Sequence, residues 1–149
     1  MEGRWRIAQF AAAFLGLAIS AYLTLYHYAG VPLVCSAHGL VDCASVLNSQ
    51  YAYVFGLPLA LYGVVFFIVE FAVLLRRNSD GIALWNMIGA GAVVYFVDIE
   101  RMVGHICEWC TAVHIIVIFL LGISLYDVLR KPSDQSHVAS AYYGDSLVP

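Results

Sequence analysis

The sequence predicts an all-α integral membrane protein: a four-transmembrane-helix bundle with a short amphipathic loop helix between the first and second helices. Composition is the first reason, because 62% of the 149 residues are hydrophobic and only 11% are charged, whereas soluble domains average roughly 45–50% and ~25%. The second reason is that charged residues bound four apolar stretches, each long enough for the ~20 residues that cross a bilayer. A formal net charge of −3 gives no indication of nucleic-acid binding.

Each apolar stretch predicts one helix, and together they form a single transmembrane domain over residues 1–131. The uncharged run after Arg6 exceeds the ~7–15 apolar residues of a signal peptide, so we expect a retained helix. Pro58 suits the first position of the second helix, where an N–H group would have no partner. The last residues, 132–149, are polar and predict a mobile tail. We expect helices near residues 6–28, 57–76, 82–103 and 106–129.

The basic residues predict the orientation of this bundle in the plasma membrane. If the helices alternate in direction, six of the seven lysines and arginines lie at one end, and Arg101 lies at the other. Because lysine and arginine are retained on the cytoplasmic side, both termini should be cytoplasmic. The first loop is then external, and the lipid bilayer surrounds the four helices. The six residues are Arg4, Arg6, Arg76, Arg77, Arg130 and Lys131.

All four cysteines are expected at the external end. Cys35 and Cys43 lie in the first loop, and Cys107 and Cys110 form a Cys-x-x-Cys pair where the fourth helix begins. On this face of the membrane disulfides can form and persist. The pattern therefore favours thiol–disulfide chemistry.

The loop helix should run from about Cys43 to Tyr51, with Asp42 as its cap. Cys43 and Cys107 would then each lie in the first turn of a helix, where the helix dipole favours a reactive thiolate. The carboxylates of Asp42 and Glu108 oppose that effect through like charge. The loop helix is predicted from the helical spacing of Val46, Leu47, Gln50 and Tyr51.

One face of the fourth helix carries a candidate site for an electron acceptor. Cys107, Cys110 and His114 have the spacing i, i+3 and i+7, which places them on a stripe about 60° wide. Ile118 and Leu121 continue this stripe as an apolar wall. The arrangement suits a flat, lipid-soluble quinone, since a thiolate can attack the ring while a hydrogen-bond donor stabilises the oxyanion.

Each of these residues also has another interpretation. The Cys-x-x-Cys pair is a redox dithiol, half of a metal site that includes His105 and His114, or two small core residues. A second cysteine pair on the same face favours the redox reading. His114 either contacts a ligand or makes an interhelical hydrogen bond.

Three acidic residues lie within or near the predicted helices. We interpret Glu70 as a structural partner, or as a side chain that reaches the surface beside Arg76 and Arg77. Asp98 and Glu100 are interpreted as interface residues in preference to a proton relay.

With these motifs placed, residues 5–130 resemble the vitamin K epoxide reductase family. The resemblance rests on an ordered set of features, none of them specific alone. They are the loop pair Cys35 and Cys43, Ser49 six residues after the second cysteine, FGLPLALYG at 55–63, and the Cys-x-x-Cys pair.

The resemblance implies a four-helix bundle around a quinone and a path for electrons. A thioredoxin-like protein engages the first loop cysteine, matched by Cys35. The second, matched by Cys43, exchanges with the residue matched by Cys107, and Cys110 matches the cysteine that faces the quinone. Many microbial members carry a fused thioredoxin-like domain, so we expect this chain to use a separate thioredoxin-like protein.

The resemblance also implies a set of quinone contacts. Ser49 matches a loop serine near the quinone, and Tyr51 matches an aromatic residue that caps the pocket. Tyr62 and Phe66 match aromatic residues that line it, although such side chains also serve as packing. His114 falls where some members carry a ligand-binding tyrosine.

The resulting hypothesis is a membrane thiol:quinone oxidoreductase that generates disulfides. Its electrons come from the thioredoxin-like partner and reach ubiquinone or menaquinone. The alternative is a non-catalytic metal-binding membrane protein that uses cysteine and histidine ligands.

Overall fold

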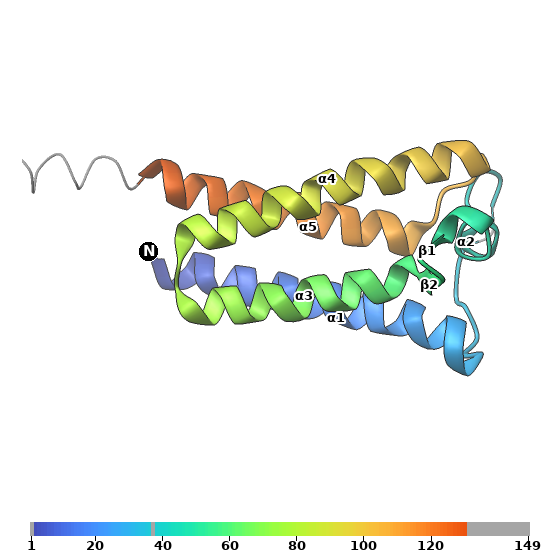
Figure 1. Cartoon of the computed structure of the whole chain (residues 1–149), viewed down its shortest axis with the longest axis horizontal. Coiled ribbons are helices and arrows are strands. Elements are labelled where there is room, and N and C mark those ends of the chain that lie inside the picture. The colour runs from blue at the N-terminus through green and yellow to red at the C-terminus, as the bar shows by residue number, and fades with distance from the viewer. Residues whose placement is uncertain (1, 37, 131–149) are drawn as a thin grey trace, which may run out of the picture.

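The computed structural model describes residues 2–36 and 38–130, and its main feature is an antiparallel bundle of four long helices (Figure 1). All four are long and apolar enough to cross a membrane, which confirms the predicted all-α membrane bundle. The predicted tail, 132–149, lies outside the described residues. The helices are α1 (Glu2–Ala29), α3 (Leu59–Arg76), α4 (Ser79–Val103) and α5 (Glu108–Arg130).

The two ends of the bundle differ in content. At one end lie the start of α1, the tight α3–α4 connection and the end of α5 (Figure 1); we call it the basic end. Arg6 ties two helices together here, because its Nη2 donates to the carbonyl of Leu74 at 3.1 Å. The connection turns on Arg77 in the left-handed conformation, and Asn78 caps α4 by accepting the N–H of Gly81. The loop and the cysteines lie at the opposite end, the cysteine end.

The helices pack through small residues and turn large apolar side chains outward. A Cβ atom on Gly16 would overlap the ring of Phe67, and one on Gly89 would lie 2.6 Å from the ring of Phe66. Close approach through glycine is the usual packing device where lipid removes the hydrophobic drive between helices. Ile7 and Leu129 are over 70% exposed, as expected of side chains that face lipid.

Four polar side chains form a buried layer about two turns from the basic end. Each helix contributes one of them, and each is at most 2% exposed. Asn86 Nδ2 donates to Glu70 Oε1 and Oε2 at 3.2 and 3.3 Å. This agrees with the interpretation of Glu70 as a structural partner, since a buried acid in a membrane requires one. The layer consists of Gln9, Glu70, Asn86 and Ser124.

Between this polar layer and the cysteine end the bundle core is apolar. Phe67 and Leu120 are fully buried, and Val93 and Val117 pack with them. From the basic end to the cysteine end, the interior therefore contains first the polar layer, then the apolar core, and then a cavity.

The loop between α1 and α3 contains more structure than one helix. The elements are α2 (Cys43–Leu47), the 3₁₀ helix η1 (Gln50–Ala52) and a hairpin of β1 (Tyr53–Val54) and β2 (Leu57–Pro58). The hairpin is antiparallel, with Tyr53 opposite Pro58 and Val54 opposite Leu57.

The expected continuous helix from Cys43 to Tyr51 is therefore wrong beyond Leu47. Asn48 Nδ2 donates to the carbonyl of Ala44, and Ser49 Oγ donates to that of Val46. Such side chains compete with the backbone for helical hydrogen bonds and end short helices. Pro58 also lies one residue earlier than expected, as the N-cap of α3.

The Glu70–Asn86 pair predicts a stability effect. Asn86→Leu should lower the free energy of unfolding by about 1–3 kcal/mol, because it leaves the buried acid of Glu70 without its donor. Adding Glu70→Leu should recover much of this loss, since removal of both polar partners can be nearly neutral. Denaturant unfolding of the purified protein in detergent measures both variants. Equal stability of Asn86→Leu and the wild type would contradict the pairing.

Candidate active site

Two backbone hydrogen bonds join the loop to the segment before α5. The N–H of Asp42 donates to the carbonyl of Ile106 at 3.1 Å, and the N–H of Ile106 donates to that of Leu40 at 2.8 Å. A cysteine follows each of the paired residues, since Cys43 comes after Asp42 and Cys107 comes after Ile106. As a result Cys43 and Cys107 are both 0% exposed and belong to the same apolar cluster.

The loop pair is a disulfide with unequal exposure. Cys35 and Cys43 are bonded, with their Cα atoms 6.2 Å apart. Cys35 is half-buried while Cys43 is fully buried, so a protein thiol from outside can approach only the first. Asp42 caps α2 as expected, and hydrogen bonds from the hydroxyl and N–H of Ser45 lower the pKa of its carboxyl.

Cys107 and Cys110 are free thiols. Cys107 directly precedes α5 rather than lying in its first turn, and its Sγ accepts the N–H of Cys110 at 3.3 Å. This places the sulfur where a helix cap accepts the first unpaired N–H groups. The hydrogen bond from the Cys110 thiol is the main cause that lowers the pKa of Cys107, and burial opposes it.

Glu100 reaches the same site from α4. Its Oε1 accepts the N–H of Cys107 at 3.1 Å. The negative charge acts against a thiolate at Cys107, because like charges disfavour each other. The interpretation of Glu100 as an interface residue therefore omits its contact with the cysteine pair.

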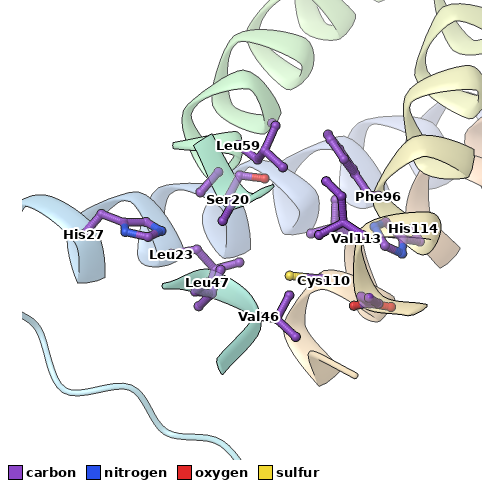
Figure 2. Close-up of a pocket in the computed structure, with 15 residues that line it drawn as sticks. Ser20, Leu23, His27, Val46, Leu47, Leu59, Phe96, Cys110, Val113 and His114 are labelled. Atoms are coloured by element: carbon purple, nitrogen blue, oxygen red, sulfur yellow. The ribbon is translucent and has the colours of Figure 1, made fainter. Parts of the chain in front are cut away.

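A cavity lies below the loop, between the ends of the four helices (Figure 2). Cys110 and His114 point into it from α5, and Val46 and Leu47 of α2 cover it from the loop (Figure 2). Its wall is mostly apolar, with a few polar groups from three helices. Ligand pockets for small molecules have this composition, a mostly apolar wall with a few polar groups. The polar groups belong to Ser20, His27, Glu100, Cys110 and His114.

The structure gathers some of the predicted ligand residues and separates others. His114 is buried against the cavity, and its ring stacks on that of Phe96 with centroids 5.9 Å apart. Ser49 Oγ binds the carbonyl of Val46, so this hydroxyl supports the cavity's cover and does not line the cavity.

The three predicted aromatic contacts also lie outside the cavity wall. Tyr62 donates to the carbonyl of Val54 at 2.9 Å, and Tyr51 is 42% exposed. Phe66 stacks on Trp85 between α3 and α4. The expected apolar wall below His114 ends early, since Ile118 is 50% exposed.

Sequence reasoning missed the contribution of α1 and α4. Ser20, Leu23 and His27 have the spacing i, i+3 and i+7, so their shared face was visible in the sequence. That face was not linked to the cysteines, because the packing of α1 beside α5 is a tertiary feature. Phe96 gave no signal of its own among the many aromatic residues.

The proposed metal-ligand set of the alternative hypothesis is not gathered in one place. Within residues 2–36 and 38–130, the group that is close enough to hold a metal ion consists of Cys35, Cys43 and Glu108, whose ligand atoms lie within 4.8 Å of one another. Its two sulfurs are bonded to each other. In this state neither sulfur is a thiolate, which is the form that binds metals.

Fold and site together define a class: a multi-pass membrane protein that holds a disulfide and a dithiol at one end of a four-helix bundle. Residues 7–125 match the model of the vitamin K epoxide reductase family, and the chain belongs to this family. No curated protein matches the chain in a sequence comparison. Family membership supports an oxidoreductase of the membrane, with quinone and disulfide chemistry.

The hydrogen bond between the two thiols predicts how Cys107 titrates. Cys110→Ala removes the main cause that lowers the pKa of Cys107, so the thiolate should form only at higher pH. Glu100→Gln should act in the opposite direction, because it removes a charge that raises this pKa. Thiolate absorbance as a function of pH measures both shifts. A midpoint that moves down in Cys110→Ala would contradict the assignment.

Proposed function

We propose that this protein is a thiol:quinone oxidoreductase that generates disulfides in other proteins. Electrons from a thioredoxin-like protein pass through Cys35/Cys43 to Cys107/Cys110, and then to a membrane quinone. One observation carries the proposal: Cys107 is buried in the same cluster as Cys43, while Cys110 lines the apolar cavity. The dithiol thus lies between the loop disulfide and a space for the acceptor.

The first step is exchange between the partner and the loop pair. A thiolate of the partner attacks Sγ of Cys35, the more exposed sulfur, and Cys43 leaves as a thiolate. The second thiol of the partner then attacks the mixed disulfide, which oxidises the partner and leaves both loop cysteines reduced. Thiol–disulfide exchange requires this in-line attack of a thiolate on a sulfur.

The second step moves the two electrons to the pair at α5. The Cys43 thiolate attacks Sγ of Cys107 in the Cys107–Cys110 disulfide, and Cys110 leaves as a thiolate. Cys35 then attacks Sγ of Cys43, which restores the loop disulfide and releases Cys107. The structure, with a loop disulfide and two free thiols at α5, has the redox state that follows this step.

The third step takes place at the cavity, whose mostly apolar wall suits a quinone ring. A quinone accepts two electrons and two protons there, as Cys107 and Cys110 close to a disulfide. Ser20 and His114 lie where a donor can stabilise the developing oxyanion. Glu100 is placed to exchange protons with the site, since it both lines the cavity and binds the N–H of Cys107.

We further propose that the remaining predicted contacts act through the cover of the cavity. Ser49 Oγ fixes the end of α2, and the Tyr62 hydroxyl fixes the hairpin. Tyr51 lies in η1 beside Ala52, which lines the cavity. Phe66 is the exception, because its ring packs against Phe67 and Trp85, and neither of these residues lines the cavity. His114 is the residue of this set that we assign to direct quinone contact.

The basic residues support an orientation with the cysteine end outside the cell. Arg4, Arg6, Arg76, Arg77 and Arg130 all belong to the basic end. The positive-inside rule places that end in the cytoplasm of a plasma membrane. The loop disulfide then meets secreted proteins, or the partner that oxidises them, in an oxidising compartment.

The reaction is tested by mixing the fully reduced protein with a soluble ubiquinone or menaquinone analogue without oxygen. Loss of quinone absorbance should occur in the wild type and fall to background in Cys110→Ala, because the sulfur that lines the cavity and would react with the quinone is then missing. Trp85→Phe, at the basic end, serves as a control that leaves all four cysteines in place. Quinone loss of equal rate in Cys110→Ala would contradict the proposal.

The order of the pairs predicts a split phenotype for Cys43→Ala. Oxidation of a reduced thioredoxin-like protein should stop, because no sulfur links Cys35 to Cys107. The reduced Cys107/Cys110 pair should still convert quinone in a single turnover. Acid quench and alkylation, followed by mass spectrometry, measure both steps. Continued oxidation of the partner by this variant would show that the loop pair is bypassed.

A further inference from the structure

The two residues between Cys107 and Cys110 contact the backbone on both sides of Cys35. Trp109 Nε1 donates to the carbonyl of Val34 at 2.6 Å. Glu108 Oε1 accepts the N–H of Ser36 at 2.9 Å. The dipeptide Glu108–Trp109, between the two cysteines, is thus hydrogen-bonded to the residue before Cys35 and to the residue after it.

A third side chain, from α1, completes this arrangement. The Tyr22 hydroxyl donates to the carbonyl of Pro32 and accepts the N–H of Val34, both at 2.9 Å. Its ring meets the ring of Trp109 edge to face, with centroids 5.6 Å apart. We call Tyr22, Glu108 and Trp109 the loop clamp.

These contacts are unusual for a segment of this kind. The stretch from Gly30 to Ser36 has no regular secondary structure, so its backbone N–H and C=O groups are not paired in a helix or a sheet. Four of them are nevertheless bound by side chains of two helices. An exposed irregular segment would bind water at little cost, so the clamp orders the loop against the entropy of a free chain.

We propose that Glu108 and Trp109 are positioning residues that keep Cys35 beside Cys43 while Cys43 exchanges with Cys107. The inference rests on the proposed electron path through the loop pair. In the step concerned, the Cys35 thiolate attacks Sγ of Cys43. The Cys35–Cys43 bond forms, the Cys43–Cys107 bond breaks, and Cys107 leaves as a thiolate. The clamp raises the rate of this step because it limits where Cys35 can move.

The geometry explains why the clamp belongs to α5 in particular. Cys43 is tied to the residue before Cys107 by the Leu40–Ile106 and Asp42–Ile106 hydrogen bonds. Cys35 is tied to the two residues that follow Cys107. The same short segment therefore restrains both loop cysteines relative to Cys107.

A first experiment measures the loop pair in isolation. In a Cys107→Ser/Cys110→Ser background, a glutathione redox buffer gives the effective concentration of Cys35 and Cys43. Trp109→Phe, which keeps the ring and loses the donor, should lower it about 5-fold, as expected for one lost hydrogen bond. Tyr22→Phe and Glu108→Ala should act in the same direction. Glu108→Gln, which retains an acceptor for Ser36, should stay closer to the parent value.

The matched control is Trp85→Phe, since Trp85 Nε1 also donates to a carbonyl, that of Phe66, but at the other end of the bundle. It should leave the loop pair unchanged. No effect of Trp109→Phe, or an equal effect of both variants, would overturn the inference. An equal loss for the Cys107/Cys110 pair, measured in a Cys35→Ser/Cys43→Ser background, would also overturn it, because the role would then be general support of α5.

A second experiment uses the protein with all four cysteines. During turnover Trp109→Phe should accumulate the Cys43–Cys107 mixed disulfide, found by acid quench and peptide mapping, because Cys35 resolves it more slowly. Faster resolution than in the wild type would overturn the clamp. If Cys35→Ser never yields that mixed disulfide, the proposed electron path itself fails. The first experiment uses no quinone and no partner, so it separates these two failures.

Discussion

The arrangement of this protein depends on two hydrogen bonds between Ile106 and the loop backbone at Leu40 and Asp42. A bilayer allows irregular backbone only where protein or water satisfies it, so the loop must find its partners at the end of the bundle. It finds them on the segment that leads into α5. Because a cysteine follows each of the paired segments, one short stretch of β-type pairing buries Cys43 and Cys107 in the same cluster.

The bundle below supplies a rigid frame for this pairing. Large apolar side chains cover the outside, and the interior holds a few polar side chains among a larger number of apolar ones. The apolar outer surface distinguishes the bundle from a soluble protein, because lipid solvates the apolar side chains that water would exclude. Polar groups can then be placed inside where they have a partner, as Glu70 has in Asn86, or where a cavity needs them, as with His114.

The four helices and the family were predictable from the sequence, because both depend on local signals: long apolar runs and a set of spaced cysteines. The position of His114 beside Cys110 followed from helical periodicity in the same way. The break after Leu47 was less visible, since it depends on the side chains of Asn48 and Ser49 competing with one weak helical turn. The face of α1 that carries Ser20 and His27 could be read as a stripe, but only the tertiary packing brings it to the cavity.

The apolar core between the cavity and the buried polar layer has an energetic consequence for the reaction. The stretches 10–19, 64–69, 87–95 and 115–123 contain no acidic, basic or histidine residue, so these parts of the four helices offer no carboxylate, amine or imidazole to carry protons across this depth. In the proposed reaction, electrons and protons then both enter the cavity from the cysteine end. On that proposal no net charge would cross the bilayer during turnover, and the proposed cycle would neither use nor build the membrane potential.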